Sequence, residues 1–113
     1  MAAKLSYAIE FVGDMKRAVK FYRDVVELPL KFESPDGTEF STGETTLALH
    51  PASAKNPAGK VEIGFEVGNL QSFYQEMTAK GVKFPMGPKE QEYGGMLAQF
   101  EDSEGASVSV GGK

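Results

Sequence analysis

The feature that most constrains this sequence is an internal repeat. Residues 10–15 (EFVGDM) are echoed in the second half of the chain by residues 65–70 (FEVGNL). In each copy a strand-like run ends in Val-Gly. Asp14 or Asn69 follows, and such a side chain accepts an orphan backbone N–H in the first turn of a helix. The sequence therefore predicts two copies of one supersecondary unit.

Apolar residues at three- and four-residue spacing predict a helix after each of these caps. The first helix is expected to bury Ala18, Val19, Tyr22, Val25 and Val26. The second is expected to bury Leu70, Phe73, Tyr74 and Met77. Gly81 then stands where a left-handed C-terminal cap is favourable.

Three shorter strand-like runs follow each helix. They are predicted at 29–33, 38–42 and 45–50 in the first half, and at 82–86, 95–101 and 106–110 in the second. The Pro- and Gly-containing segment 52–59 is predicted to be a linker. We therefore predict an α+β fold in a single domain, 1–113, built from two βαβββ units at 4–51 and 60–111. Units this small bury little surface alone, so we expect curved mixed sheets that enclose a cavity, with the helices outside.

Composition excludes several kinds of chemistry. The 113 residues contain no cysteine, which excludes disulfides, thiolate metal sites and a cysteine nucleophile. The net charge is −4 and no cluster of lysine and arginine occurs, so nucleic acid is not an expected partner. No run approaches the roughly 20 apolar residues of a membrane span, and the first residues lack a signal-peptide pattern. A soluble, cytoplasmic protein without a membrane partner is expected.

Two segments carry a resemblance to a known family. Residues 11–28 (FVGDMKRAVKFYRDVVEL) combine a Val-x-Asp helix start with a Phe-Tyr pair. Tyr93-Gly94-Gly95 precedes the turn at 100–105 (FEDSEG), where Ser103 replaces the family's usual proline. With the repeat spacing, these motifs resemble the vicinal oxygen chelate superfamily. This group includes glyoxalase I, extradiol dioxygenases, fosfomycin resistance enzymes and the bleomycin resistance proteins.

The resemblance implies four positions for metal ligands, two in each unit. In this sequence they hold Tyr7, Ala48, Glu62 and Ser109. Alanine cannot bind a metal, a neutral serine binds poorly, and a tyrosine would have to ionise against a reference pKa of about 10. Catalytic metal sites usually supply about three protein ligands. We therefore expect neither a metal nor any other cofactor, and no catalytic residue is assigned.

Period-two alternation groups the side chains that share a strand face with these four positions. Together with Tyr93, whose loop borders the pocket in the family, they form the predicted ligand-binding set: Tyr7, Ile9, Phe11, Thr46, Ala48, His50, Glu62, Glu66, Tyr93, Gln99, Ser107 and Ser109. The opposite faces are predicted to pack under the helices through Leu47, Leu49, Ile63, Phe65, Val67, Val108 and Val110.

A face of aromatic rings, hydroxyls and carboxylates suits a small, partly aromatic organic ligand. In site character it resembles the metal-free bleomycin resistance branch. The leading hypothesis is a homodimeric, metal-free protein that sequesters such a molecule, with antibiotics as one class. Two alternatives stay open. One is a metal-dependent lyase, isomerase or dioxygenase with displaced ligands such as Glu62 and His50, and the other is an interaction module whose cavity is filled.

Glu10 fits this arrangement poorly. Alternation places it on the helix side of its strand, where an unpaired carboxylate is costly. It could lie at an edge, or pair with Arg17 or Lys20. Alternatively, the two faces of this strand are reversed, so that Glu10 lies in the pocket and Tyr7 does not.

Overall fold

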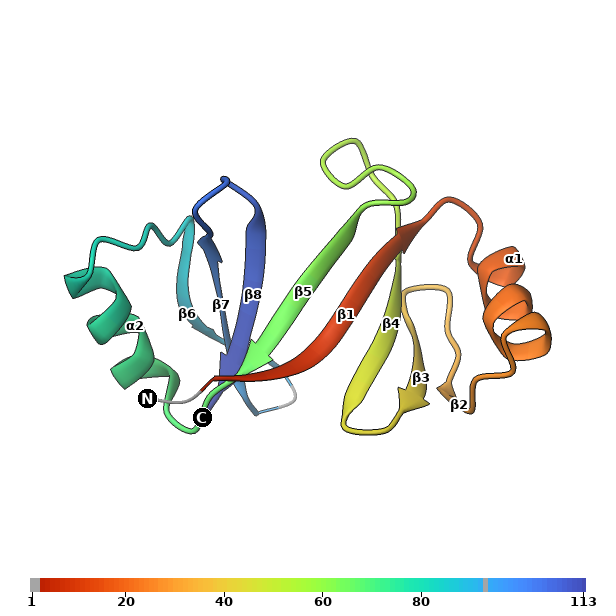
Figure 1. Cartoon of the computed structure of the whole chain (residues 1–113), viewed down its shortest axis with the longest axis horizontal. Coiled ribbons are helices and arrows are strands. Elements are labelled where there is room, and N and C mark those ends of the chain that lie inside the picture. The colour runs from red at the N-terminus through yellow and green to blue at the C-terminus, as the bar shows by residue number, and fades with distance from the viewer. Residues whose placement is uncertain (1–2, 93) are drawn as a thin grey trace. The chain divides into compact units, whose positions relative to one another are not determined.

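The computed structural model describes residues 3–92 and 94–113, which form two compact units. The first unit is Ser6–Val61, and the second is Glu62–Lys113 with the N-terminal residues up to Leu5. Figure 1 labels their helices and strands. The predicted α+β class is confirmed, because each unit contains one helical segment and a mixed sheet in the order strand, helix, three strands.

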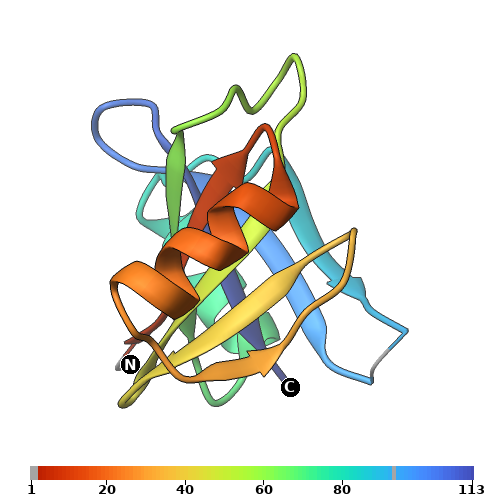
Figure 2. The ribbon, with the colours of Figure 1, turned by 90° about the vertical axis from the view of Figure 1, so that its right-hand side faces the viewer.

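The first unit contains β1 (Lys4–Val12), α1 (Met15–Lys20), the π-helical segment η1 (Phe21–Val25), β2 (Leu30–Phe32), β3 (Thr38–Thr42) and β4 (Thr45–Pro51). Its strands lie in the order β2-β3-β4-β1. β1 pairs with β4 in parallel, whereas β3 is antiparallel to both of its neighbours. Figure 2 shows α1 lying across this sheet.

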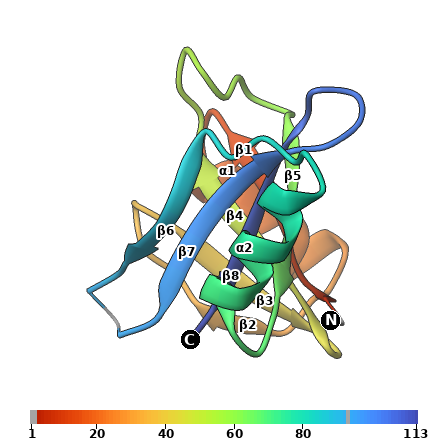
Figure 3. The same ribbon diagram turned by 90° about the vertical axis from the view of Figure 1, so that its left-hand side faces the viewer.

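The second unit repeats this topology with β5 (Val61–Glu66), α2 (Leu70–Ala79), β6 (Met86–Glu90), β7 (Met96–Glu101) and β8 (Ser107–Gly112). The strand order is β5-β8-β7-β6, with β5 and β8 parallel and the other pairs antiparallel. Figure 3 shows α2 over one face of this sheet. The equivalence of the two units confirms the topology expected from the sequence repeat.

Both predicted helix caps are present. The Asp14 Oδ1 atom accepts a hydrogen bond of 3.0 Å from the Arg17 backbone N–H, and Asn69 Oδ1 accepts one of 2.9 Å from the Ser72 N–H. Gly81 has a φ of 91°, the left-handed conformation predicted for the end of α2. The repeated sequence therefore starts a helix in each unit with the same type of cap hydrogen bond.

Each unit has its own apolar core between helix and sheet. In the first unit, Val19 of α1 packs with Val12, Phe40 and Leu49, and Leu47 packs against this cluster. In the second unit the cluster is Val67, Leu70, Phe73, Ala98 and Val110, with Phe65 packed against it. Val108 is also buried. Full burial of one such side chain stabilises the fold by about 1.5–3 kcal/mol.

Three local predictions are wrong. Val25 and Val26 are exposed, because the helix widens after Lys20 and the Val26 N–H bonds to the Phe21 carbonyl, five residues back. This wider turn rotates the two valines away from the core. Ile63 is also exposed rather than buried. The strand predicted at 82–86 is β6, Met86–Glu90. Residues 82–85 form no strand, because the Val82 N–H still bonds to the Met77 carbonyl of α2 and, among the described residues, Lys83 makes a single backbone bond, to the Glu101 N–H.

The linker between the repeats is held against the end of β1. The Phe11 N–H donates to the Lys60 carbonyl at 2.9 Å, and the Gly59 N–H donates to the Phe11 carbonyl at 2.8 Å. The Ala52 N–H donates to the Val12 carbonyl at 2.8 Å. Residues on either side of this loop are therefore fixed relative to β1 within the first unit.

Candidate functional site

One sheet face of the first unit brings together six residues of the predicted ligand-binding set. The parallel register of β1 and β4 pairs Tyr7 with Thr46, Ile9 with Ala48, and Phe11 with His50. Directly paired residues on neighbouring strands project to the same side of a sheet. This surface, called the β1/β4 face below, therefore carries all six side chains.

The β1/β4 face is part aromatic and part polar. The Phe11 and His50 rings meet edge to face with their centroids 6.0 Å apart, a favourable aromatic geometry. Phe11, Thr46 and Ala48 are buried, whereas Tyr7 and His50 are exposed. The face thus offers one aromatic wall and one accessible ring at each end of the strand pair.

Lys31 is a polar member of this face that sequence reasoning missed. Its Nζ atom donates a 2.8 Å hydrogen bond to Thr46 Oγ1 and lies 4.0 Å from Glu39 Oε1. Alternation along the 29–33 strand places Lys31 on the opposite side from Leu30 and Phe32. The sequence does not say which of the two sides is the β1/β4 face, and the hydrogen bond to Thr46 assigns it.

In the second unit, the central feature is a hydrogen bond between two predicted site residues. Ser109 Oγ donates to Glu62 Oε2 at 2.5 Å, and both residues are buried, with 8% and 5% of their surface exposed. Gln99 and Gly64 are the register partners of Ser109 on the neighbouring strands. Short hydrogen bonds to a carboxylate are among the stronger ones in proteins, so this pair is held in place.

The remaining predicted residues of the second unit are less enclosed. Ser107 pairs with Glu101 across β7 and β8, and is half-buried. Glu66 is exposed, and its register partner is Gly111. Tyr93, predicted to border the pocket, lies outside the described residues.

The donor set at the four family ligand positions does not fit a divalent cation. In the first unit these positions hold a buried alanine and a phenol. In the second, the serine hydroxyl donates a hydrogen bond to Glu62 Oε2, so one oxygen of the carboxylate already has a protein donor. No group of three or more His, Asp or Glu side chains within residues 3–92 and 94–113 could hold a metal ion. The residues present therefore supply one conventional ligand, Glu62, where about three are usual.

Glu10 lies on the helix side of β1, opposite the β1/β4 face, so the strand faces are not reversed. Its partner is neither Arg17 nor Lys20, the two cations that were considered. Instead the Tyr22 hydroxyl donates to Glu10 Oε1 at 2.5 Å. This hydrogen bond, together with burial and the negative charge of Glu10, raises the pKa of Tyr22 to about 12. The phenol therefore stays protonated and keeps donating at neutral pH.

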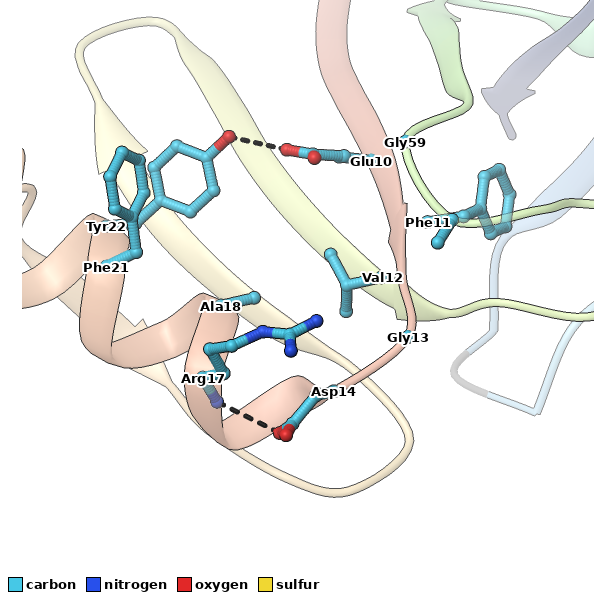
Figure 4. Close-up of a pocket in the computed structure, with 11 residues that line it drawn as sticks. Glu10, Phe11, Val12, Gly13, Asp14, Arg17, Ala18, Phe21, Tyr22 and Gly59 are labelled. Carbon is cyan, nitrogen blue, oxygen red and sulfur yellow. Dashed lines mark hydrogen bonds between the residues drawn. The ribbon is translucent and has the colours of Figure 1, made fainter.

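An open pocket of about 380 Å³ surrounds this pair on the helix side of β1. Its lining comes from the end of β1, the α1/η1 helix and the linker, and consists of Glu10, Phe11, Val12, Gly13, Asp14, Arg17, Ala18, Phe21, Tyr22, Ala58 and Gly59. Figure 4 shows Glu10 reaching toward the helix and Arg17 reaching toward the strand. Phe11 is the one predicted site residue in this lining.

Two βαβββ units, each with a mixed sheet and one helical segment on it, define a recognisable class of α+β proteins. The chain belongs to the Glyoxalase/Bleomycin resistance protein/Dioxygenase superfamily, whose family model matches residues 4–110. Among curated proteins, no sequence matches this chain.

Several solved structures share the fold. A hypothetical protein from Bacillus halodurans has a TM-score of 0.81 at 18% identity, with 100% of this chain and 96% of that chain covered. A superfamily member from Vibrio splendidus has a TM-score of 0.72 at 14% identity, covering 99% and 100%. The methylmalonyl-CoA epimerase of Streptomyces coelicolor, in complex with 2-nitronate-propionyl-CoA, has a TM-score of 0.77 at 18% identity, covering 97% and 94%. These TM-scores establish a common fold with this chain.

The described residues contain no helix with both the length and the apolar character needed to cross a membrane.

Proposed function

We propose that this protein binds a small, partly aromatic organic molecule without a metal ion and without altering it. The observation that carries the proposal is the buried hydrogen bond between Ser109 and Glu62. A carboxylate used in this way has one oxygen already occupied by a protein donor. The metal-dependent reactions of the superfamily polarise substrate oxygens on a cation, and this donor set does not favour holding one.

The β1/β4 face supports an aromatic ligand. It combines the Phe11 and His50 rings with the exposed ring of Tyr7, onto which a flat molecule can stack. The Lys31 ammonium and the Thr46 hydroxyl supply polar groups beside these rings. Glu62, Glu66, Gln99, Ser107 and Ser109 remain proposed ligand contacts from the second unit, as does Tyr93.

The direct test is calorimetric titration of the purified protein with a panel of aromatic and cationic antibiotics that includes bleomycin. We expect saturable binding with unaltered ligand recovered afterwards. Tyr7→Ala and His50→Ala should weaken it about tenfold, as expected for the loss of aromatic contacts. Lys55→Ala, an exposed change in the linker, is the matched control and should leave the affinity unchanged.

Metal content separates this proposal from a metal-dependent enzyme with displaced ligands. Protein purified without chelators should contain far less than one equivalent of Zn²⁺, Ni²⁺, Mn²⁺ or Fe²⁺ by elemental mass spectrometry. One tightly held equivalent that is lost in Glu62→Gln or His50→Ala would refute the metal-free proposal.

We further propose that the protein is a homodimer, since units of this size bury little apolar surface alone. Light scattering during gel filtration should report twice the monomer mass. A monomeric mass at micromolar concentration would contradict this part of the proposal and leave the binding proposal intact.

A further inference from the structure

The pocket around Glu10 is a second candidate site, whose lining shares only Phe11 with the β1/β4 face. Glu10 and Val12 alternate along β1 with Ile9 and Phe11, so the two sites use opposite sides of the same strand. A volume of about 380 Å³ lies within the range of small-molecule sites, about 300–1,000 Å³. Ligands could therefore occupy this pocket independently of the function proposed above.

The pocket holds a carboxylate that a single side-chain hydrogen bond fixes in place. Glu10 is half-buried, and burying a charge is costly unless it is well paired. Oε1 accepts the hydrogen bond from Tyr22, and among the described residues Oε2 has no donor. The Tyr22 hydroxyl thus fixes the carboxylate while leaving one oxygen available for a ligand N–H group.

A cation stands on the helical wall of the same pocket. The Arg17 backbone N–H is used by the Asp14 cap, but within residues 3–92 and 94–113 its guanidinium group has no hydrogen bond or ion pair. Figure 4 shows this side chain extending from α1 into the space in front of Val12. A guanidinium group presents a fork of donors that matches a carboxylate.

Two further polar residues line the pocket, Tyr22 and Asp14, and the remaining side chains are apolar. The Asp14 Oδ1 atom is already used as the cap of α1. Phe21 has 50% of its surface exposed, and Ala18 and Val12 form the wall between the two charged groups. A ring or branched aliphatic chain that covers Phe21 would bury this exposed surface. The pocket therefore combines the Glu10 carboxylate, the Arg17 guanidinium group and an apolar wall, with the capping carboxylate of Asp14 at the start of α1.

We propose that this pocket binds the zwitterionic head group of a free amino acid with an apolar side chain. The ligand ammonium group donates to Glu10 Oε2, the ligand carboxylate accepts from the Arg17 guanidinium group, and the side chain lies against Phe21. A molecule that carries only one of the two charges leaves either Glu10 or Arg17 without its partner. Specificity for both charges is therefore the distinguishing property of this site.

L-Phenylalanine is the probe for a titration followed by ¹H–¹⁵N NMR spectra of the whole chain. Saturable shifts should be confined to amides around the pocket, including those of Gly13, Ala18 and Gly59. Phenethylamine, which lacks the carboxylate, and phenylacetate, which lacks the ammonium group, should each bind at least about tenfold more weakly. Equal binding of either analogue would overturn the proposal, as would shifts confined to the β1/β4 face.

Variants test the two charged groups separately. Arg17→Gln changes an exposed residue, so we expect the fold to be kept, and it should weaken L-phenylalanine binding about tenfold or more. Lys16→Gln, an exposed change of the same charge one position earlier, is the matched control and should bind normally. Tyr22→Phe should weaken binding by releasing the Glu10 carboxylate. Unchanged affinity in Arg17→Gln would refute the assignment. Failure here would leave the antibiotic titrations on the β1/β4 face unaffected.

Discussion

Replacing Ser109 with alanine tests the central hydrogen bond of the second unit. Ser109→Ala removes the donor to Glu62 Oε2. Glu62 has only 5% of its surface exposed, so its carboxylate would lose that partner without full access to water. Hydrogen bonds to charged groups contribute about 1.5–3 kcal/mol, and an unsatisfied buried acceptor costs a similar amount. We expect the free energy of unfolding to fall by about 2 kcal/mol.

Urea denaturation followed by circular dichroism measures this change. Small proteins have slopes of about 1–3 kcal/mol per molar urea, so a loss of about 2 kcal/mol moves the midpoint down by roughly 1 M. Ser107→Ala is the control, because Ser107 lies on the same strand face two residues away and is half-buried. Its midpoint should stay within the range of an ordinary surface change, about 0.5 kcal/mol.

A double-mutant cycle separates the hydrogen bond from the loss of the hydroxyl itself. Glu62→Met removes the buried charge, so adding Ser109→Ala to that variant should cost little. The expected coupling energy between the two positions is about 1.5–3 kcal/mol. Additive effects, or a Ser109→Ala midpoint equal to that of Ser107→Ala, would refute the reasoning. Glu62 would then have no fixed partner and would again be a candidate metal ligand.

Three further predictions concern the backbone and Tyr22. Gly112→Ala should destabilise the protein by about 1–3 kcal/mol in the same urea assay, because its Cβ would lie 2.6 Å from the Val67 carbonyl oxygen. Gly111→Ala is the control and should be tolerated, because the nearest atom to its Cβ would be 3.6 Å away. Glu27 has a φ of 65°, so Glu27→Gly should raise the thermal midpoint through a gain of up to about 1 kcal/mol, and a loss of stability would contradict this. The pKa of Tyr22 is raised to about 12, so the stability that its protonated form contributes is complete below pH ~10 and is lost as the pH rises through about 12. In an ultraviolet phenolate titration, Tyr22→Phe should remove the step near pH 12, and loss of a step near pH 10 instead would show that the hydrogen bond to Glu10 is absent.

The fold class and unit topology could be predicted from the sequence because their signals are local. The helix caps at Asp14 and Asn69 depend on residues three positions away, and the cap at Gly81 depends on its own φ. Strand alternation likewise identified Leu49 and Val110 as core residues, and both are completely buried. Such features need no knowledge of distant parts of the chain.

Local pattern failed where a small change in geometry altered which way side chains point. The widened turns of η1 break the 3.6-residue period, and Val25 and Val26 become exposed although they continue the apolar series. The start of β6 at Met86 followed from pairing with β7, which the residues of 82–86 do not encode by themselves. In both cases the observed and the predicted conformations differ little in the intrinsic preference of their residues, and tertiary packing selects one of the two.

The repeat, the caps and the poor set of metal donors could be read from the amino-acid sequence, since each is a property of residue identity or of neighbours along the chain. The hydrogen-bond partners of the isolated polar groups depend on how the chain packs in three dimensions. Glu10 accepts its hydrogen bond from Tyr22, twelve residues away in the sequence, and Glu62 accepts one from Ser109, forty-seven residues away. A carboxylate requires a donor when it is buried, but which donor reaches it depends on strand register and helix packing, and these are set by the whole core.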